Sequence, residues 1–279
     1  MVAMLSKARG LIVSDLDGTL VANTEVSQEN VEAIKAAKAL GFGFVIATGR
    51  NANGVRRRLI DWNLEGLVDA IIGSNGSELI DLNQSEAMEV IDGIEPKVLK
   101  DITRILAGKS YGCCYYTPTE VHSNPNNPEI EYIAAELKVP IVIHEDINEN
   151  FPPLQPKVII FLHSAADRYF KTLLDNNKQE AYETCFSFPT YLEILPVGMN
   201  KAKGLQRLID RYQINPQNVL VMGDNDNDVE MLALVENSVV MGNGTPLAIA
   251  AAKKQVGDFE QHGVAEAIYW FLEQQKTIL

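Results

Sequence analysis

The chain has 279 residues, of which 46% are hydrophobic and 22% are charged, and its formal net charge at pH 7 is −13. This length leaves room for one large core with a smaller second unit, and the composition is that of a globular protein. The acidic balance argues against a nucleic-acid-binding surface or a polybasic membrane patch, because either needs clustered Lys and Arg.

Strands and helices are predicted to alternate from the start of the chain. Residues 11–13 form a short apolar run that gives way to Ser14 and Asp15, as a buried parallel strand does at its carboxyl end. A helix is expected after Ser27, and further strands over 42–47 and 70–72. Three strand–helix repeats imply right-handed crossovers and a parallel sheet.

The pattern changes from about residue 84 to residue 193, where helical segments alternate with strands in the manner of an α+β unit. After Leu195-Pro196 the first pattern returns, with predicted helices over 201–212 and 264–274, a strand over 218–222, and a strand and turn over 239–242. We therefore predict an α/β fold: a Rossmann-like, doubly wound parallel sheet built from residues 1–83 and 194–279, with an inserted α+β domain over residues 84–193.

The three cysteines are odd in number and form no CxxC pattern, which favours a reducing compartment. No apolar run approaches the length of about twenty residues that crosses a bilayer. The opening residues Met1 to Gly10 also lack the apolar centre of a signal peptide. We therefore expect a cytoplasmic protein that neither spans a membrane nor binds one.

Polar clusters follow the predicted strands, and they include several carboxylates. Asp15-Leu16-Asp17-Gly18-Thr19-Leu20 follows the first strand, and Gly223-Asp224-Asn225-Asp226-Asn227-Asp228 follows a later one. The carboxyl ends of parallel strands meet at one edge of a sheet. We therefore expect four carboxylates to converge there, those of Asp15, Asp17, Asp224 and Asp228.

Four converging carboxylates need a cation if they are to stay ionised. Magnesium prefers oxygen ligands and can bridge a carboxylate and a phosphate. Residues 223–228 could also be a capped helix start, whereas a calcium loop is excluded because the required Gly and closing Glu spacing are absent. The sequence therefore predicts a Mg²⁺ site.

These clusters, in this order, resemble the motifs of the haloacid dehalogenase-like phosphatases. The first is similar to DxDGT, Ala47-Thr48-Gly49-Arg50 to the second motif, Gly198-Met199-Asn200-Lys201 to the third, and residues 223–228 to GDxxND. Ala202 departs from the Gly that often follows the lysine, and Lys203 is a nearby competitor for its role. The inserted unit resembles the larger α+β cap (type IIB) of the Cof-like subgroup. Asn75-Gly76 resembles that subgroup's loop after the third strand, and residues 261–264 resemble its late asparagine/acid-Gly-Val segment, so the resemblance covers nearly the whole chain.

The resemblance implies a role for each motif residue. Asp15 would be the nucleophile that forms an aspartyl-phosphate, and Asp17 the general acid and base. The catalytic set is completed by two residues that stabilise the phosphoryl group, Thr48 and Lys201. The substrate-binding set comprises Thr48, Gly49, Arg50, Asn75, Gly76, Lys201 and Asn227. The metal-binding set comprises Asp15, Asp17 through its backbone carbonyl, Asp224 and Asp228, which could act directly or through its neighbours.

The expected activity is Mg²⁺-dependent hydrolysis of a small phosphorylated metabolite, either a sugar phosphate or a cofactor phosphate. One alternative is a phosphotransferase or mutase, which the motifs do not separate from a phosphatase. Another is a phospho-acceptor module resembling bacterial response regulators, whose acidic pair and acceptor lie at separate strand ends. Here Asp15 and Asp17 share one strand end. The oligomeric state cannot be read from these patterns.

Overall fold

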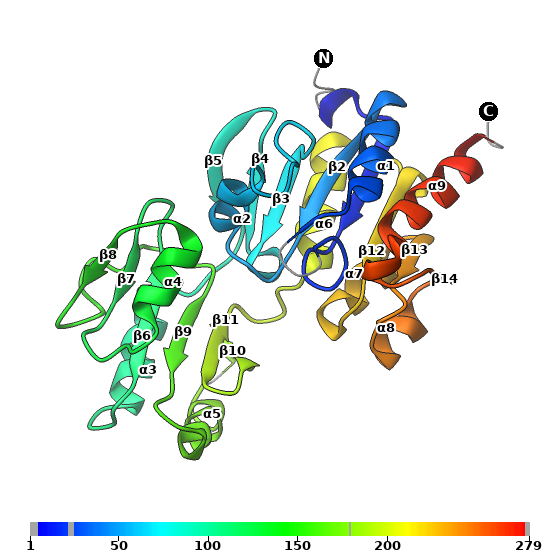
Figure 1. Cartoon of the computed structure of the whole chain (residues 1–279). Helices are drawn as coiled ribbons and strands as arrows, with labels where there is room; N and C mark the ends of the chain where they lie inside the picture. Colours follow the sequence, from blue (N-terminus) through cyan, green and yellow to red (C-terminus); the bar gives the residue numbers. More distant parts are fainter. Residues whose placement is uncertain (1–4, 22–24, 179, 277–279) are drawn as a thin grey trace. The chain divides into compact units, whose positions relative to one another are not determined.

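The structure is a computed structural model that describes residues 5–21, 25–178 and 180–276 (Figure 1). It divides into two compact units, one comprising Met1–Glu89 with Asn200–Leu279 and the other Val90–Met199. The boundaries predicted from sequence, at 83/84 and 193/194, lie slightly earlier in the chain than those of the structure, at 89/90 and 199/200. The first differs because β5 (Ser85–Val90) still belongs to the sheet of the first unit.

The first unit is built on an eight-stranded sheet in the order β14-β13-β12-β1-β2-β3-β4-β5. Six of its strands run parallel to their neighbours, which confirms the predicted parallel sheet. They are β1 (Gly10–Ser14), β2 (Phe42–Ala47), β3 (Ala70–Gly73), β12 (Val219–Gly223), β13 (Asn237–Val240) and β14 (Lys254–Gln255). The next strand, β4 (Glu78–Asp81), is antiparallel to β3 and forms a hairpin with it.

Helices cover both faces of this sheet. In Figure 1, α1 (Gln28–Ala39) and α9 (Gly263–Lys276) lie together on one side, and with α2 (Ala52–Arg58) they share a core with alternate strand residues such as Ile12 and Phe44. The intervening strand residues are buried as well, and α6 (Lys201–Tyr212) and α7 (Val229–Leu234) pack against strands β3, β12 and β13. A short helix, α8 (Pro246–Ala251), packs on α7. The fold is therefore doubly wound, as predicted.

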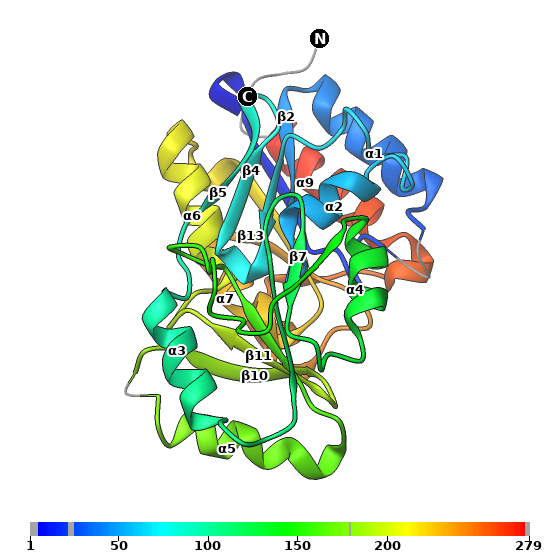
Figure 2. The same cartoon turned by 90° about the vertical axis from the view of Figure 1, so that its left-hand side faces the viewer.

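The second unit contains a six-stranded, mostly antiparallel sheet in the order β10-β11-β9-β6-β7-β8. Its strands are β6 (Gly112–Tyr116), β7 (Val121–Ser123), β8 (Ile141–Ile143), β9 (Val158–Phe161), β10 (Glu183–Phe188) and β11 (Tyr191–Leu195). Figure 2 shows α3 (Pro96–Ile105) and α5 (Tyr169–Asp175) apart from α4 (Ile130–Leu137), and the two sets of helices bury separate apolar clusters. This is the α+β unit that the sequence predicts.

Among the described residues, no helix is both long and apolar enough to cross a membrane.

Candidate active site

The predicted site residues meet where the central parallel strands end. Asp15 follows β1, Thr48 follows β2 and Asp224 follows β12, and β1 pairs with both of the other strands. Backbone hydrogen bonds continue past the strand ends, from Asp15 N to Met222 O at 2.9 Å and from Thr48 N to Ile72 O at 2.8 Å. The sheet thus holds these side chains at the carboxyl ends of its strands, which is where open α/β folds bind ligands.

Three carboxylates lie close together, and a buried ammonium group contacts two of them. Oxygen atoms of Asp15, Asp224 and Asp228 all lie within 4.8 Å of one another. Lys201 Nζ donates to Asp15 Oδ1 at 2.5 Å and to Asp228 Oδ1 at 2.6 Å, and the lysine side chain is 1% exposed. Lys203, in contrast, is exposed. The structure therefore places Lys201, and not its competitor, in contact with the cluster.

Asp228 shapes the loop that carries Asp224. Its Oδ2 accepts from the backbone N–H groups of Asp224 and Asn225, each at 3.0 Å, while its Oδ1 accepts from Lys201. The residue is fully buried. Both carboxylate oxygens of Asp228 are thus engaged by protein donors, whereas the loop presents Asp224 toward Asp15.

Asp224 is held by two residues that the motif analysis did not single out. Thr19 Oγ1 donates to Asp224 Oδ1 at 2.8 Å, and Asn243 Nδ2 lies 3.3 Å from Asp224 Oδ2 and 2.9 Å from Gly18 O. Gly18 has a φ of +82°, and a Cβ added there would lie 2.6 Å from Asp224 Oδ2. Only glycine allows this close approach at low cost. Thr19 belongs to the first motif, while Asn243 carries no local signal.

The crowding of charge shifts the ionisation of the cluster. Burial raises the pKa of the Asp15 carboxyl well above its usual range, opposed by the attraction of Lys201, and burial also raises the pKa of Asp224. Burial alone would lower the pKa of Lys201, but Asp15 and Asp228 outweigh it and raise that pKa. One ammonium group cannot balance the charge of three carboxylates. The atoms that the cluster offers as metal ligands are all oxygens. This set suits a hard divalent cation such as Mg²⁺.

A second group of predicted residues forms the neighbouring wall. Thr48 Oγ1 accepts from Arg50 N at 3.1 Å, Asn75 N donates to Thr48 O at 3.0 Å, and Asn227 Nδ2 donates to Asn75 Oδ1 at 3.1 Å. A Cβ added at Gly49 would lie 3.2 Å from Asn75 Oδ1. The loop after β3, residues 74–76, therefore packs against the loop after β2 and places the side-chain amide of Asn75 beside Gly49, where it meets the amide of Asn227.

This loop after β3 has an unusual backbone. Ser74 and Asn75 have φ values of 46° and 53°, and Gly76, which was predicted to bind substrate, has a φ of 105°. Successive left-handed residues that are not glycine are costly and persist only where surrounding contacts hold them. Here Ser74 N donates to Arg50 O at 2.8 Å, which joins the strained turn to the loop after β2.

Asp17 differs from the expectation that four carboxylates converge. Its side chain is 51% exposed and pairs with Arg50, whose Nε and Nη2 donate to the two carboxylate oxygens at 2.8 Å and 2.6 Å. Among the described residues, the carboxylate cluster comprises only Asp15, Asp224 and Asp228. The guanidinium of Arg50 offers Asp17 two aligned donors, whereas the carboxylate cluster is already crowded with negative charge.

The buried contacts of Lys201 also lead to a prediction about stability. We expect Lys201→Met to lower the free energy of unfolding by about 3–5 kcal/mol, because it leaves two buried carboxylates without their counter-ion. Urea denaturation measures the change. The matched control is Lys203→Met, an exposed position expected to stay within about 0.5 kcal/mol of the parent. Equal stability of the two variants would contradict the buried arrangement.

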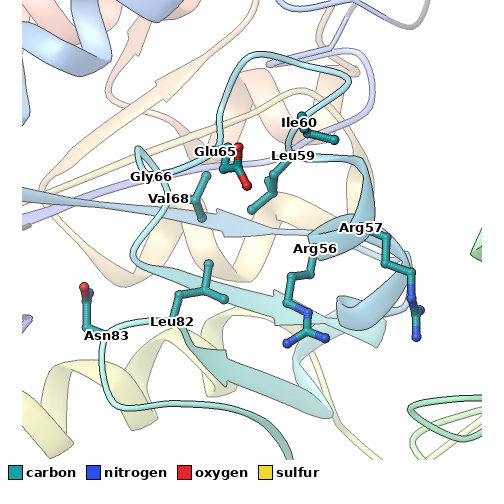
Figure 3. A pocket seen from close by; sticks show the side chains of 9 residues that line it. All are labelled: Arg56, Arg57, Leu59, Ile60, Glu65, Gly66, Val68, Leu82 and Asn83. Atoms are coloured by element: carbon teal, nitrogen blue, oxygen red, sulfur yellow. The ribbon is translucent and has the colours of Figure 1, made fainter.

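A cavity of about 440 Å³ lies elsewhere in the first unit (Figure 3). Its walls come from α2, from the segment before β3 and from the segment after β4, and they combine apolar side chains with two arginines. The lining residues are Arg56, Arg57, Leu59, Ile60, Glu65, Gly66, Val68, Leu82 and Asn83. None of them is a predicted site residue, so the cavity is separate from the strand ends where the carboxylates gather.

Known proteins match this chain over most of its length. Residues 12–268 match the family model described as haloacid dehalogenase-like hydrolase. The 5-amino-6-(5-phospho-D-ribitylamino)uracil phosphatase YitU of Bacillus subtilis (strain 168) is 26% identical over 260 residues, which cover 91% of this chain and 94% of YitU.

Two solved structures share the fold. A haloacid dehalogenase-like hydrolase from Bacteroides thetaiotaomicron matches with a TM-score of 0.83 and 26% identity, covering 93% of this chain and 98% of that one. The subclass IIB sugar phosphatase BT4131 matches with a TM-score of 0.75 and 22% identity, covering 94% and 98%. The motif order and the α+β insertion between Thr48 and Lys201 agree with these matches. The chain therefore belongs to the haloacid dehalogenase-like hydrolases and is a phosphatase of their Cof-like type.

Proposed function

We propose that the protein hydrolyses a small phosphorylated metabolite in a Mg²⁺-dependent reaction that passes through an aspartyl-phosphate on Asp15. One observation carries the proposal. The buried carboxylate of Asp15 lies at the end of β1, in contact with Lys201 and within 4.8 Å of the Asp224 and Asp228 carboxylates. A carboxylate held beside an ammonium group at the carboxyl end of a parallel strand can attack phosphorus and form an acyl-phosphate.

The metal would be held by the carboxylates of Asp15 and Asp224 and by the backbone carbonyl of Asp17. When bound, Mg²⁺ offsets the negative charge of these groups and of the entering phosphate. Asp228 is assigned a supporting role, because its oxygens already accept from Lys201 and from two backbone N–H groups. It keeps the loop of Asp224 in place and the ammonium of Lys201 oriented.

Two displacements account for the reaction. In the first, an Asp15 oxygen bonds to phosphorus while the bond to the leaving oxygen breaks, and Asp17 donates a proton to that oxygen. In the second, Asp17 takes a proton from water, the water oxygen attacks phosphorus, and inorganic phosphate leaves with regeneration of the Asp15 carboxylate. The transferred group would be oriented by Lys201 Nζ, Thr48 Oγ1 and the backbone N–H groups of its loop.

The substrate is proposed to be a sugar phosphate or a cofactor phosphate. Both are alkyl phosphate esters, as is the phosphorylated ribityl compound named for YitU. Such esters have poor leaving groups, which is where a proton donor such as Asp17 contributes most. We assign the choice among these substrates to the inserted unit, and the side-chain amides of Asn75 and Asn227 to contacts with the phosphate end. A cytoplasmic location remains a prediction from the cysteine content.

A phosphate-release screen tests the proposal. The purified protein, with Mg²⁺ and no added acceptor, is expected to liberate inorganic phosphate from a subset of sugar and cofactor phosphates. Asp15→Asn serves as the blank for every compound. If phosphate appeared only after a sugar acceptor had been supplied, or if the label moved within the substrate, the protein would be a phosphotransferase or mutase. Stable labelling of the protein without turnover would indicate a phospho-acceptor module.

A further inference from the structure

The side chain of Arg50 is turned toward Asp17. Its Nε donates to Asp17 Oδ2 at 2.8 Å and its Nη2 to Asp17 Oδ1 at 2.6 Å, so that the guanidinium and the carboxylate share a fork-to-fork contact. Both side chains are about half exposed, at 42% for Arg50 and 51% for Asp17. This contact fixes the plane of the carboxylate as well as its position.

A half-exposed aspartate without such a partner would sample several staggered orientations. Proton transfer to a leaving oxygen requires one of them, with donor and acceptor within hydrogen-bond reach. A planar guanidinium that engages both oxygens selects an orientation in a way that a point charge does not. Orientation of Asp17 is therefore a task that the observed contact can perform.

The backbone of Arg50 has a separate role. Its N–H donates to Thr48 Oγ1 at 3.1 Å, and its carbonyl accepts from Ser74 N at 2.8 Å. A side-chain substitution leaves both hydrogen bonds available, so the loop that carries Thr48 should keep its shape. The function of the guanidinium can thus be tested without disturbing the neighbouring wall of the site.

We propose that Arg50 is a positioning residue that orients the Asp17 carboxylate for proton transfer, and that it does not act as a substrate ligand. The inference rests on the proposed function, since it presupposes that Asp17 is the general acid and base. It replaces the sequence-based expectation that Arg50 binds substrate. Arg50 would affect the rate only through Asp17, so the effect of replacing Arg50 should vanish when the Asp17 carboxylate is removed.

Arg50→Gln is expected to lower kcat for an alkyl phosphate by about 10- to 100-fold, the scale on which misplacement of a reacting group slows catalysis. KM should be unchanged. With p-nitrophenyl phosphate, whose leaving group needs little protonation, formation of the phosphoenzyme should be nearly unaffected. Arg50→Lys should restore part of the rate, because an ammonium keeps the charge but cannot hold both oxygens in one plane.

A double-mutant comparison separates positioning from binding. In the Asp17→Asn background, adding Arg50→Gln should change neither kcat nor KM, because the group being positioned has lost its function. A substrate ligand would instead add the same rise in KM in either background. Lys35→Gln is the matched control, since it breaks an exposed ion pair with Glu32 on α1 and should leave activity unchanged. Circular dichroism should show the same fold for all of these variants.

The outcomes distinguish this inference from the proposed function. If Asp15→Asn is inactive and Asp17→Asn is impaired mainly with poor leaving groups, the proposed function stands. If under those conditions Arg50→Gln raises KM alike for both substrates, or if its effect persists undiminished in the Asp17→Asn background, Arg50 is a substrate ligand and the positioning role is wrong. Residual turnover by Asp15→Asn would overturn the proposed function itself.

Discussion

Asp15→Asn is expected to abolish turnover of every substrate, including activated aryl phosphates. An amide at this position is a poor nucleophile and cannot form the acyl-phosphate of the parent enzyme. The fold should survive, because the amide oxygen can still accept from Lys201 at the end of β1. The measurement is phosphate release at high enzyme concentration, with Lys35→Gln carried through the same purification to show that the procedure yields active protein.

Asp17→Asn should give a different result. Steady-state hydrolysis of alkyl phosphates should fall by about 10²- to 10⁴-fold, the usual contribution of acid–base catalysis. With an aryl phosphate, Asp15 should still be phosphorylated while its hydrolysis is slow. Rapid mixing should then show a burst of phenol and a protein-bound phosphate that resists acid and is released by hydroxylamine. Absence of any phosphoenzyme, together with activity in Asp15→Asn, would favour direct attack by metal-activated water.

Removal of divalent cations is the second change that we expect to abolish activity completely. Treatment with EDTA should eliminate activity and Mg²⁺ should restore it, because one lysine faces three carboxylates and an anionic substrate. Calcium should support little turnover, since it is larger and less strict in its coordination. Phosphate release and calorimetric titration with Mg²⁺ measure the two effects.

The metal experiment has a matched pair of variants within the chain. Asp224→Asn should weaken Mg²⁺ binding strongly, whereas Asp226→Asn, at an exposed position in the same loop, should bind Mg²⁺ like the parent. Full activity of the chelated protein would contradict the metal-dependent mechanism. Equal Mg²⁺ affinity of the two variants would leave Asp224 outside the ligand set.

Most of the fold could be predicted because its signals are local. An apolar run that ends in polar residues identifies a buried parallel strand, and this holds for β1, β2, β3 and β12. Capping was also readable, since Ser27 accepts from Asn30 N at the start of α1 as expected. The end of α2 is harder to read, because the spacing of Val55, Leu59 and Trp62 is helical whereas the regular helix ends at Arg58 and turns follow it.

What could not be predicted depends on contacts between residues far apart in the chain. Asn243 reaches Gly18 O and Asp224 Oδ2 from the turn after β13, and no pattern near Asn243 indicates this. The direction of the Asp17 side chain is similar, because it depends on Arg50 from the next strand–loop unit. Motif spacing gives the order of the polar clusters, whereas side-chain partners follow from how the loops pack.

The two left-handed residues after β3 bear on how this protein could be engineered. Glycine at position 74 or 75 would adopt the observed φ values without penalty and so remove local strain. The same change would let the hairpin relax among several conformations, and at position 75 it would also delete the amide that meets Asn227. Selection for thermal stability alone would therefore favour variants in which this wall of the active site is less rigid. A library of variants at these positions should be screened for turnover at every round.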